Sequence, residues 1–297
     1  MNREPHNSSD GLTLEMTGDS SATFYSEEFG EWFHNRSGAY TDAQKNYVDA
    51  ANIPELAKAD RLAILDVCYG LGYNTAAALD TVFQVNPSCH VTIRALEINA
   101  LVPQKAVTAN LIHHWSPTTQ QILKTLATEH SYRSPHVDIQ LVIGDARQTI
   151  QSILDQGWGA DAILFDPFSP TRCPQLWTVE FFELTAQCLA DRGILATYSC
   201  AAAVRTAMGL AGLTIGSLPG TGRNWPCTIA TKDGRCLPAL SQQEQEHLQT
   251  RAAVPYRDPT LTATAEAIVA QRQQEQEHCS LEPTGAWRRR WLTGPRR

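Results

Sequence analysis

The chain has 297 residues, 42% of them hydrophobic, which suffices for one large α/β domain with additions or for two small ones. Its formal net charge of −7 argues against a broadly basic nucleic-acid coat, and no apolar run approaches the about 20 residues of a transmembrane helix. The first residues lack the apolar core of a secretory signal, and the eight cysteines are scattered without a Cys-x-x-Cys pair, so we expect a cytoplasmic protein with reduced thiols and no metal site.

The first 60 residues precede the regular part of the sequence. Residues 1–21 are polar and predict a flexible N-terminus. Residues 22–60 predict an extension that covers the site, with a short strand or hairpin and a loop over 22–34 and a helix over 41–51.

Residues 61–232 alternate between apolar runs and helical stretches. The expected strands are 62–67, 91–96, 138–143, 161–165 and 193–198, and the expected helices are 74–84, 101–114, 147–156, 175–190 and 201–211. This alternation predicts an α/β fold with a doubly wound, mainly parallel, Rossmann-like sheet. Two further runs, 213–218 and 227–231, flank a glycine-rich turn and predict an antiparallel edge hairpin.

Residues 233–297 are rich in Gln and Glu and predict polar helices over 241–251 and 262–278. We expect this tail to pack on the outside of the domain without a core of its own. Its end, residues 287–297, holds five arginines and two tryptophans. Such a basic end could bind phosphate and stack on bases, or it could pair with the acidic body of the chain.

The first core strand leads into a glycine-rich turn and then a helix. Gly70 and Gly72 would let the backbone approach a nucleotide-like ligand, with the N–H groups of the helix that holds Asn74 facing it. Asp66, within the strand, is expected to hold loop amides. A plain tight turn is the alternative.

Acids also follow the next two strands. Glu97 is a natural acceptor for ribose hydroxyls, and Asp145, followed by Ala146, could accept from an adenine amino group. Asp145 could equally cap the next helix, and the two roles are compatible. Because ligands bind at the carboxyl ends of parallel strands, these groups together fit one adenosyl ligand.

The fourth strand ends in Asp166-Pro167-Phe168-Ser169-Pro170. The prolines make a stiff turn whose carbonyls we expect to be free to accept hydrogen bonds. A carboxylate beside such carbonyls suits an amine, because Asp166 could orient it and take its proton. Phe168 could stack on a base, or it could be a core residue.

Several segments together resemble the MnmC-type tRNA methyltransferases over roughly residues 20–232. The matching segments are Phe24–Glu31, Gly70–Asn74, Asp166–Pro170, Pro174–Trp177 and Gly220-x-Gly222-Arg223. The resemblance implies a class I fold and methyl transfer from S-adenosylmethionine to the aminomethyl group of the tRNA wobble uridine. Many relatives are fused to a flavin-dependent oxidase domain, and the length of this chain predicts the stand-alone form, with a separate enzyme supplying the aminomethyl-uridine.

In that scheme Asp166 occupies the position of the catalytic acid. The substrate-binding residues would be Pro167, Phe168, Arg172 and Arg223, with the two arginines meeting tRNA phosphates near the anticodon unless they are merely solvated. The cofactor-binding residues would be Asp66, Gly70, Gly72, Asn74, Glu97, Asp145 and Ala146.

Two departures from the family pattern concern geometry. Cys68 stands where the family loop usually begins with glycine, so its side chain could narrow the turn. Pro167 stands where Gly or Ala is usual.

Three other functions stay open. One keeps the cofactor but methylates another amine or a base nitrogen. A second is a non-catalytic RNA-binding protein on the same fold. The third, an NAD-dependent oxidoreductase, is disfavoured because Thr75 replaces the last glycine of Gly-x-Gly-x-x-Gly and Glu97 follows Asp66 too late in the chain.

Overall fold

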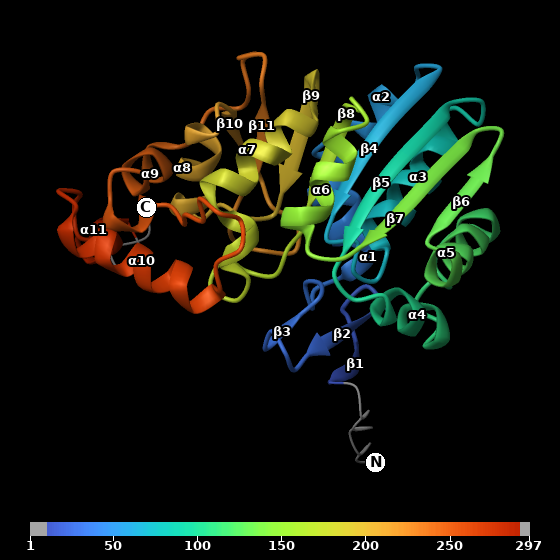
Figure 1. Ribbon diagram of the computed structural model, residues 1–297, viewed down its shortest axis with the longest axis horizontal. Coiled ribbons are helices and arrows are strands. Elements are labelled where there is room, and N and C mark those ends of the chain that lie inside the picture. The colour runs from blue at the N-terminus through green and yellow to red at the C-terminus, as the bar shows by residue number, and fades with distance from the viewer. Residues whose placement is uncertain (1–10, 292–297) are drawn as a thin grey trace.

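The structure, a computed structural model, describes residues 11–291, and its centre is an eight-stranded sheet (Figure 1). The strands lie in the order β10-β11-β9-β8-β4-β5-β7-β6. Their bounds are β4 (Arg61–Val67), β5 (His90–Glu97), β6 (Ser131–Ser134), β7 (Val137–Ile143), β8 (Ala160–Phe165), β9 (Leu189–Thr197), β10 (Thr214–Leu218) and β11 (Cys227–Thr231).

The five strands β9, β8, β4, β5 and β7 are parallel, which confirms the doubly wound sheet expected from the alternation. β10 and β11 form the expected antiparallel edge. The chain leaves β4 toward β5 on one side, while β8 pairs with β4 on the other. The carboxyl ends of β4 and β8 therefore flank the switch point of the sheet, where open α/β sheets bind ligands.

Helices cover both faces of the sheet and divide the core into two clusters. One face carries α2 (Ile53–Leu56), α3 (Tyr73–Val85) and α5 (Pro117–Glu129). The other carries α6 (Ala146–Leu154), α7 (Val179–Cys188) and α8 (Ala202–Leu210). α4 (Leu101–Thr108) packs beside α5.

A small three-stranded antiparallel sheet lies below the central sheet in Figure 1: β1 (Leu12–Met16), β2 (Ala22–Ser26) and β3 (Glu31–Trp32). The chain then continues through α1 (Ala39–Asp42) and the π-helix η1 (Ala43–Asp49), and η1 packs against α3 in the main core. The expectation of a loose segment over 1–21 therefore does not hold for residues 11–21. Asp19 explains part of this order, because its carboxylate accepts from the backbone N–H groups of Ser21 and Thr41 at 3.1 and 2.9 Å.

Several expected helices have different bounds, and several elements were not expected. The helix expected over 101–114 ends at Thr108, and the one expected over 175–190 divides into η2 (Pro174–Trp177) and α7. α5 and β6 lie in a Thr- and Gln-rich segment without a continuous apolar run. Ser116 starts α5 by accepting from the backbone N–H of Thr119 at 3.3 Å.

The C-terminal residues pack on the domain as expected, through α9 (Gln242–His247), η3 (Arg251–Ala253), α10 (Ala265–His278) and α11 (Thr284–Trp291). Tyr256 and Ile268 join the core beneath α6 and α7. Trp287 is buried and stacks on His247 with ring centroids 4.1 Å apart. Arg290 pairs with Glu246 and Glu282, so this part of the basic end pairs with acids of the chain; Arg296 and Arg297 lie outside the described residues.

All eight cysteines are free thiols. Within residues 11–291, no helix is long and apolar enough to cross a membrane, and no group of three or more His, Cys, Asp or Glu side chains is arranged to hold a metal ion.

Candidate functional site

A cavity of about 560 Å³ lies at the carboxyl ends of β4, β5, β7 and β8. Residues of the small sheet β1–β3 and of the loop that follows it, among them Tyr25, Trp32 and Phe33, also line the cavity. Its volume is typical of small-molecule sites. Of the site residues expected from the sequence, the wall contains Gly70, Asn74, Glu97, Asp145, Ala146, Asp166, Pro167, Phe168 and Arg223.

The glycine-rich turn forms one side of the cavity. Gly70 and Gly72 have φ angles of +53° and +82°, in the left-handed region that favours glycine. Gly72 lies behind the wall and caps α3, and a Cβ there would lie 2.6 Å from the Tyr69 hydroxyl oxygen. Cys68 has a φ of +70°, so the residue that departs from the family pattern holds a conformation that costs a side-chain-bearing residue about 1 kcal/mol or more. It lines the cavity.

Asp66 lies beneath this turn and does not line the cavity. It is fully buried and accepts from the Thr75 hydroxyl at 2.6 Å, while its other oxygen, Oδ1, has no partner among residues 11–291. Burial raises its pKa to about 7, against the opposing effect of the Thr75 hydrogen bonds. Asp66 thus supports the start of α3.

Glu97 joins the turn to the end of β5. Its two carboxylate oxygens accept from the backbone N–H groups of Gly70 at 2.8 Å and Asn99 at 2.9 Å. Burial raises its pKa, and these bonds work in the opposite direction. A carboxylate offers about four lone-pair sites, so Glu97 keeps capacity for a ligand hydroxyl in the cavity.

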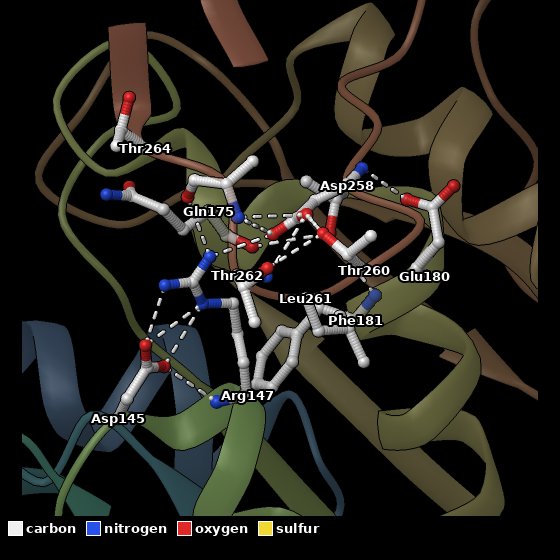
Figure 2. A network of polar contacts seen from close by, with 12 residues as sticks. Asp145, Arg147, Gln175, Glu180, Phe181, Asp258, Thr260, Leu261, Thr262 and Thr264 are labelled. Carbon is white, nitrogen blue, oxygen red and sulfur yellow. Dashed lines mark hydrogen bonds and ion pairs between the residues drawn. The ribbon is translucent and has the colours of Figure 1, made fainter. Parts of the chain in front are cut away.

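Asp145, which the sequence assigns to the adenine amino group or to a helix cap, lies at the start of α6. It caps α6 by accepting from the backbone N–H of Arg147 at 2.9 Å, and it lines the cavity next to Ala146. The Arg147 guanidinium also bonds the Asp145 carboxylate, at 2.7 Å for its closest nitrogen (Figure 2).

Asp166 lies at the other end of the cavity, where β8 ends. Its carboxylate accepts from the Tyr47 hydroxyl and, at 2.9 Å, from the Asn74 side-chain amide. Burial raises the pKa of Asp166 well above its usual range and the nearby Asp42 carboxylate raises it further, although the bonds from Tyr47 and Asn74 oppose both. Asp166 is therefore suited to take a proton from an amine in the cavity.

The segment around η1 supplies groups that the sequence did not indicate. Asp42, which lines the cavity, is bonded by the Asn46 side-chain amide and lies 3.5 Å from the Arg223 guanidinium. Tyr47 comes from the same π-helix, a local geometry frequent at functional sites. Pattern reasoning missed both because nothing local distinguishes this helix from an ordinary one.

Two backbone carbonyls of the turn at residues 166–168 already accept hydrogen bonds from side chains. The Pro167 carbonyl accepts from the Tyr198 hydroxyl at 3.1 Å, and the Phe168 carbonyl accepts from the Trp177 indole at 2.8 Å. The expectation that these carbonyls are free was therefore wrong. Phe168 stacks on Phe29 with centroids 4.4 Å apart, so one face of its ring is already covered.

The two arginines expected at the substrate side differ in position. Arg223 is partly buried in the cavity wall, where it donates to the Tyr198 carbonyl at 3.3 Å and its cationic group lies 5.0 Å from the centroid of the Tyr198 ring. Arg172 is exposed and lies against Gly30, outside the wall.

These residues fit an adenosyl ligand. The carboxylates of Glu97 and Asp145 suit hydroxyl and amino donors, and Gly70 lets the backbone line the cavity where a Cβ would lie 3.3 Å from the Phe33 ring. The side-chain oxygens of Asn74 and Gln175 also belong to cavity residues and find no partner among the described residues. Buried polar atoms of this kind normally have partners, which points to a polar ligand.

Comparisons with known proteins define the class. A family model described as S-adenosyl-L-methionine-dependent methyltransferase matches residues 106–233. The crystal structure of MnmC2 from Aquifex aeolicus superposes with a TM-score of 0.80 at 27% identity, covering 93% of this chain and 88% of that one. Fold, cavity and family model together define an S-adenosylmethionine-dependent methyltransferase.

Two relatives of known sequence are similar to much of this chain. The bifunctional protein MnmC of Azoarcus, named for tRNA 5-methylaminomethyl-2-thiouridine biosynthesis, is 28% identical over 67% of this chain. An uncharacterized protein of Methanocaldococcus jannaschii is 28% identical over 89% of this chain and 72% of its own length. The protein is an MnmC-like methyltransferase. It spans only 32% of the length of the Azoarcus protein.

Proposed function

We propose that this enzyme methylates the primary amine of an aminomethyl group on the tRNA wobble uridine, converting 5-aminomethyl-(2-thio)uridine to its 5-methylaminomethyl form. The name of the Azoarcus relative, which refers to tRNA 5-methylaminomethyl-2-thiouridine biosynthesis, suggests this substrate. The observation that carries the proposal is the partly buried carboxyl of Asp166 in the cavity wall, with its raised pKa, next to an Asn74 oxygen that has no partner among the described residues. With tRNA as substrate, the enzyme would act in the cytoplasm.

The cofactor would be held by the glycine-rich turn, Glu97, Asp145 and Ala146, with Asp66 and Gly72 behind them. When bound, S-adenosylmethionine supplies an electrophilic methyl group on sulfur. The remaining chemistry is the preparation of the amine, which arrives from water as an ammonium.

Asp166 would accept one proton from that ammonium, which would leave the nitrogen with a free lone pair directed toward the methyl group that the bound cofactor would supply. A raised carboxyl pKa makes this transfer less unfavourable, because it brings the acid closer to the amine in proton affinity. The Asn74 amide donates to Asp166 through its nitrogen, so its unpartnered oxygen can accept a second N–H of the amine and orient the lone pair.

The RNA contacts follow from the same geometry. Arg223, in the cavity wall, would contact the modified nucleotide, and the exposed Arg172 would meet a phosphate of the anticodon region. Pro167 and Phe168 would form the wall against the base. A separate enzyme would provide the aminomethyl-uridine.

The direct test is methyl transfer from labelled S-adenosylmethionine to tRNA from a strain that lacks this enzyme, with fully modified tRNA as the control. We expect transfer to the first and none to the second, and mass spectrometry of wobble nucleosides from the deletion strain should show the unmethylated aminomethyl form. Transfer to a different nucleoside or amine would replace the acceptor in the proposal. Tight tRNA binding without any transfer would instead indicate a non-catalytic RNA-binding protein.

A further inference from the structure

A stretch of the C-terminal region, residues 256–263, lies next to Arg147 and Asp145, two residues that line the cavity (Figure 2). It contacts the start of α7, where the backbone N–H of Val179 donates to the Tyr256 carbonyl at 3.1 Å and Glu180 accepts from the backbone N–H of Asp258 at 2.7 Å. It also contacts α6, where the Gln148 side chain donates to the Leu261 carbonyl at 3.0 Å.

Arg147 connects this stretch to the cavity. One nitrogen of its guanidinium donates to the Asp258 carboxylate at 2.8 Å and to the Ala263 carbonyl at 2.9 Å. Its other nitrogens donate to the Asp145 carboxylate, at 2.7 Å and 3.1 Å for Oδ2. The guanidinium thus lies between a carboxylate in the cavity wall and one in the C-terminal region.

The Asp258 side chain is well fixed for this contact. It is fully buried and also accepts from the backbone N–H groups of Thr262 and Ala263 at 3.2 Å. Burial acts to raise its pKa, but the bonds from Ala263 and Arg147 outweigh burial and leave the pKa lowered. Asp258 is therefore a charged, immobile partner, and Arg147, with a side chain only 11% exposed, has little freedom to move away.

Asp145 gains its orientation from this arrangement. A side-on pair of guanidinium nitrogens fixes the plane of a carboxylate, which a single helix-capping bond does not. The Asp145 side chain remains 34% exposed, so one side of the carboxylate stays accessible from the cavity that it lines.

We propose that Arg147 and Asp258 are positioning residues for the cofactor: the C-terminal stretch fixes the Asp145 carboxylate so that it selects the 6-amino group of adenine. This inference rests on the cofactor site of the proposed function. It assigns the C-terminal region a part in ligand selectivity, in addition to its packing on the domain.

The test compares two ligands by isothermal titration calorimetry. S-adenosylhomocysteine has the 6-amino group, whereas S-inosylhomocysteine has a carbonyl oxygen there, which a carboxylate repels. We expect the wild-type protein to prefer the first ligand. Asp258→Asn should weaken S-adenosylhomocysteine binding by roughly tenfold, the size of one well-oriented hydrogen bond, and should leave S-inosylhomocysteine binding nearly unchanged.

Glu244→Gln is the matched control. Glu244 is also a C-terminal acid paired with a buried arginine of the domain, Arg205, at 2.7 Å, but it does not line the cavity. Its substitution should leave the affinities for both ligands at the wild-type values. Arg147→Lys keeps the positive charge but loses the pair of guanidinium nitrogens that bond the Asp145 carboxylate. It should show the same loss of ligand selectivity as Asp258→Asn, and it replaces that variant in the test if Asp258→Asn does not fold.

Equal weakening of both ligands in Asp258→Asn and Arg147→Lys, or the same loss of selectivity in Glu244→Gln, would overturn the inference, because a general structural effect would then suffice. Unchanged selectivity in folded variants would also overturn it. By contrast, a wild-type protein that binds neither ligand would refute the proposed function.

Discussion

Replacing Asp166 by Asn should separate stability from activity. The change keeps the shape of the side chain, leaves an oxygen that can accept a hydrogen bond, and removes a buried charge beside Asp42. The pKa of Asp166 is raised from 3.8 on folding, so the folded state holds the proton more tightly than the unfolded state. Wild-type stability should therefore fall as the pH rises from about 4 through the folded-state pKa, by up to about 1.4 kcal/mol per pH unit.

Asparagine does not titrate, so the stability of the Asp166→Asn variant should not fall in this way as the pH rises. We expect Asp166→Asn to unfold at a higher urea concentration than the wild type at pH 8, with a difference that shrinks toward pH 5. Turnover on aminomethyl tRNA should drop by about 10²- to 10⁴-fold, the usual contribution of a general base. Tryptophan fluorescence in urea between pH 5 and 8 measures the first effect, and labelled methyl transfer measures the second. A stability difference independent of pH, or wild-type turnover, would refute the reasoning.

Three further substitutions test residues that lie behind the cavity wall. Burial raises the pKa of Asp66 to about 7, so the free energy of unfolding of the wild type should fall by up to about 4 kcal/mol between pH 4 and pH 7. Asp66→Asn should abolish this fall, and urea unfolding at pH 4 and at pH 7 would detect the difference. Tyr47→Phe removes a hydrogen-bond donor to Asp166 and should lower the free energy of unfolding by about 1–3 kcal/mol, as measured by thermal denaturation. An unchanged melting temperature would show that this hydrogen bond does not stabilise the protein. Gly72→Ala places a Cβ 2.6 Å from the Tyr69 hydroxyl at a positive φ and should lower both stability and S-adenosylhomocysteine affinity, whereas normal calorimetric binding would show that the turn adjusts.

Local patterns were sufficient for the parts of the site that follow the strands. Gly70, Glu97, Asp145 and Asp166 each come directly after an apolar run, and the geometry of a parallel sheet brings such positions together. The contact between Tyr47 and Asp166 could not be predicted in this way, because it joins residues 119 positions apart.

The same limit applies beside Asp145, where Arg147 and Asp258 are separated by 111 positions. Asp258 lies in a polar, proline-flanked stretch that resembles a surface loop, and only the packing of Tyr256 and Ile268 into the core brings it inside. Contacts that depend on how an extension packs against the sheet have no signal in the periodicity of either segment.

In the proposed assignment, the two extensions serve opposite ends of one cavity: Tyr47 of η1 donates to Asp166 at the amine end, and Asp258 of the C-terminal stretch accepts from Arg147 at the adenine end. No hydrogen bond or ion pair shown by the described residues is shared between Tyr47 and Asp258. Their effects should consequently be independent, since mutations without common partners usually add to within about 0.5 kcal/mol. In a double-mutant cycle, Tyr47→Phe should leave S-adenosylhomocysteine affinity unchanged whether or not Asp258→Asn is present. A coupling clearly above that limit in calorimetric titrations would mean that the amine and adenine ends act as one unit.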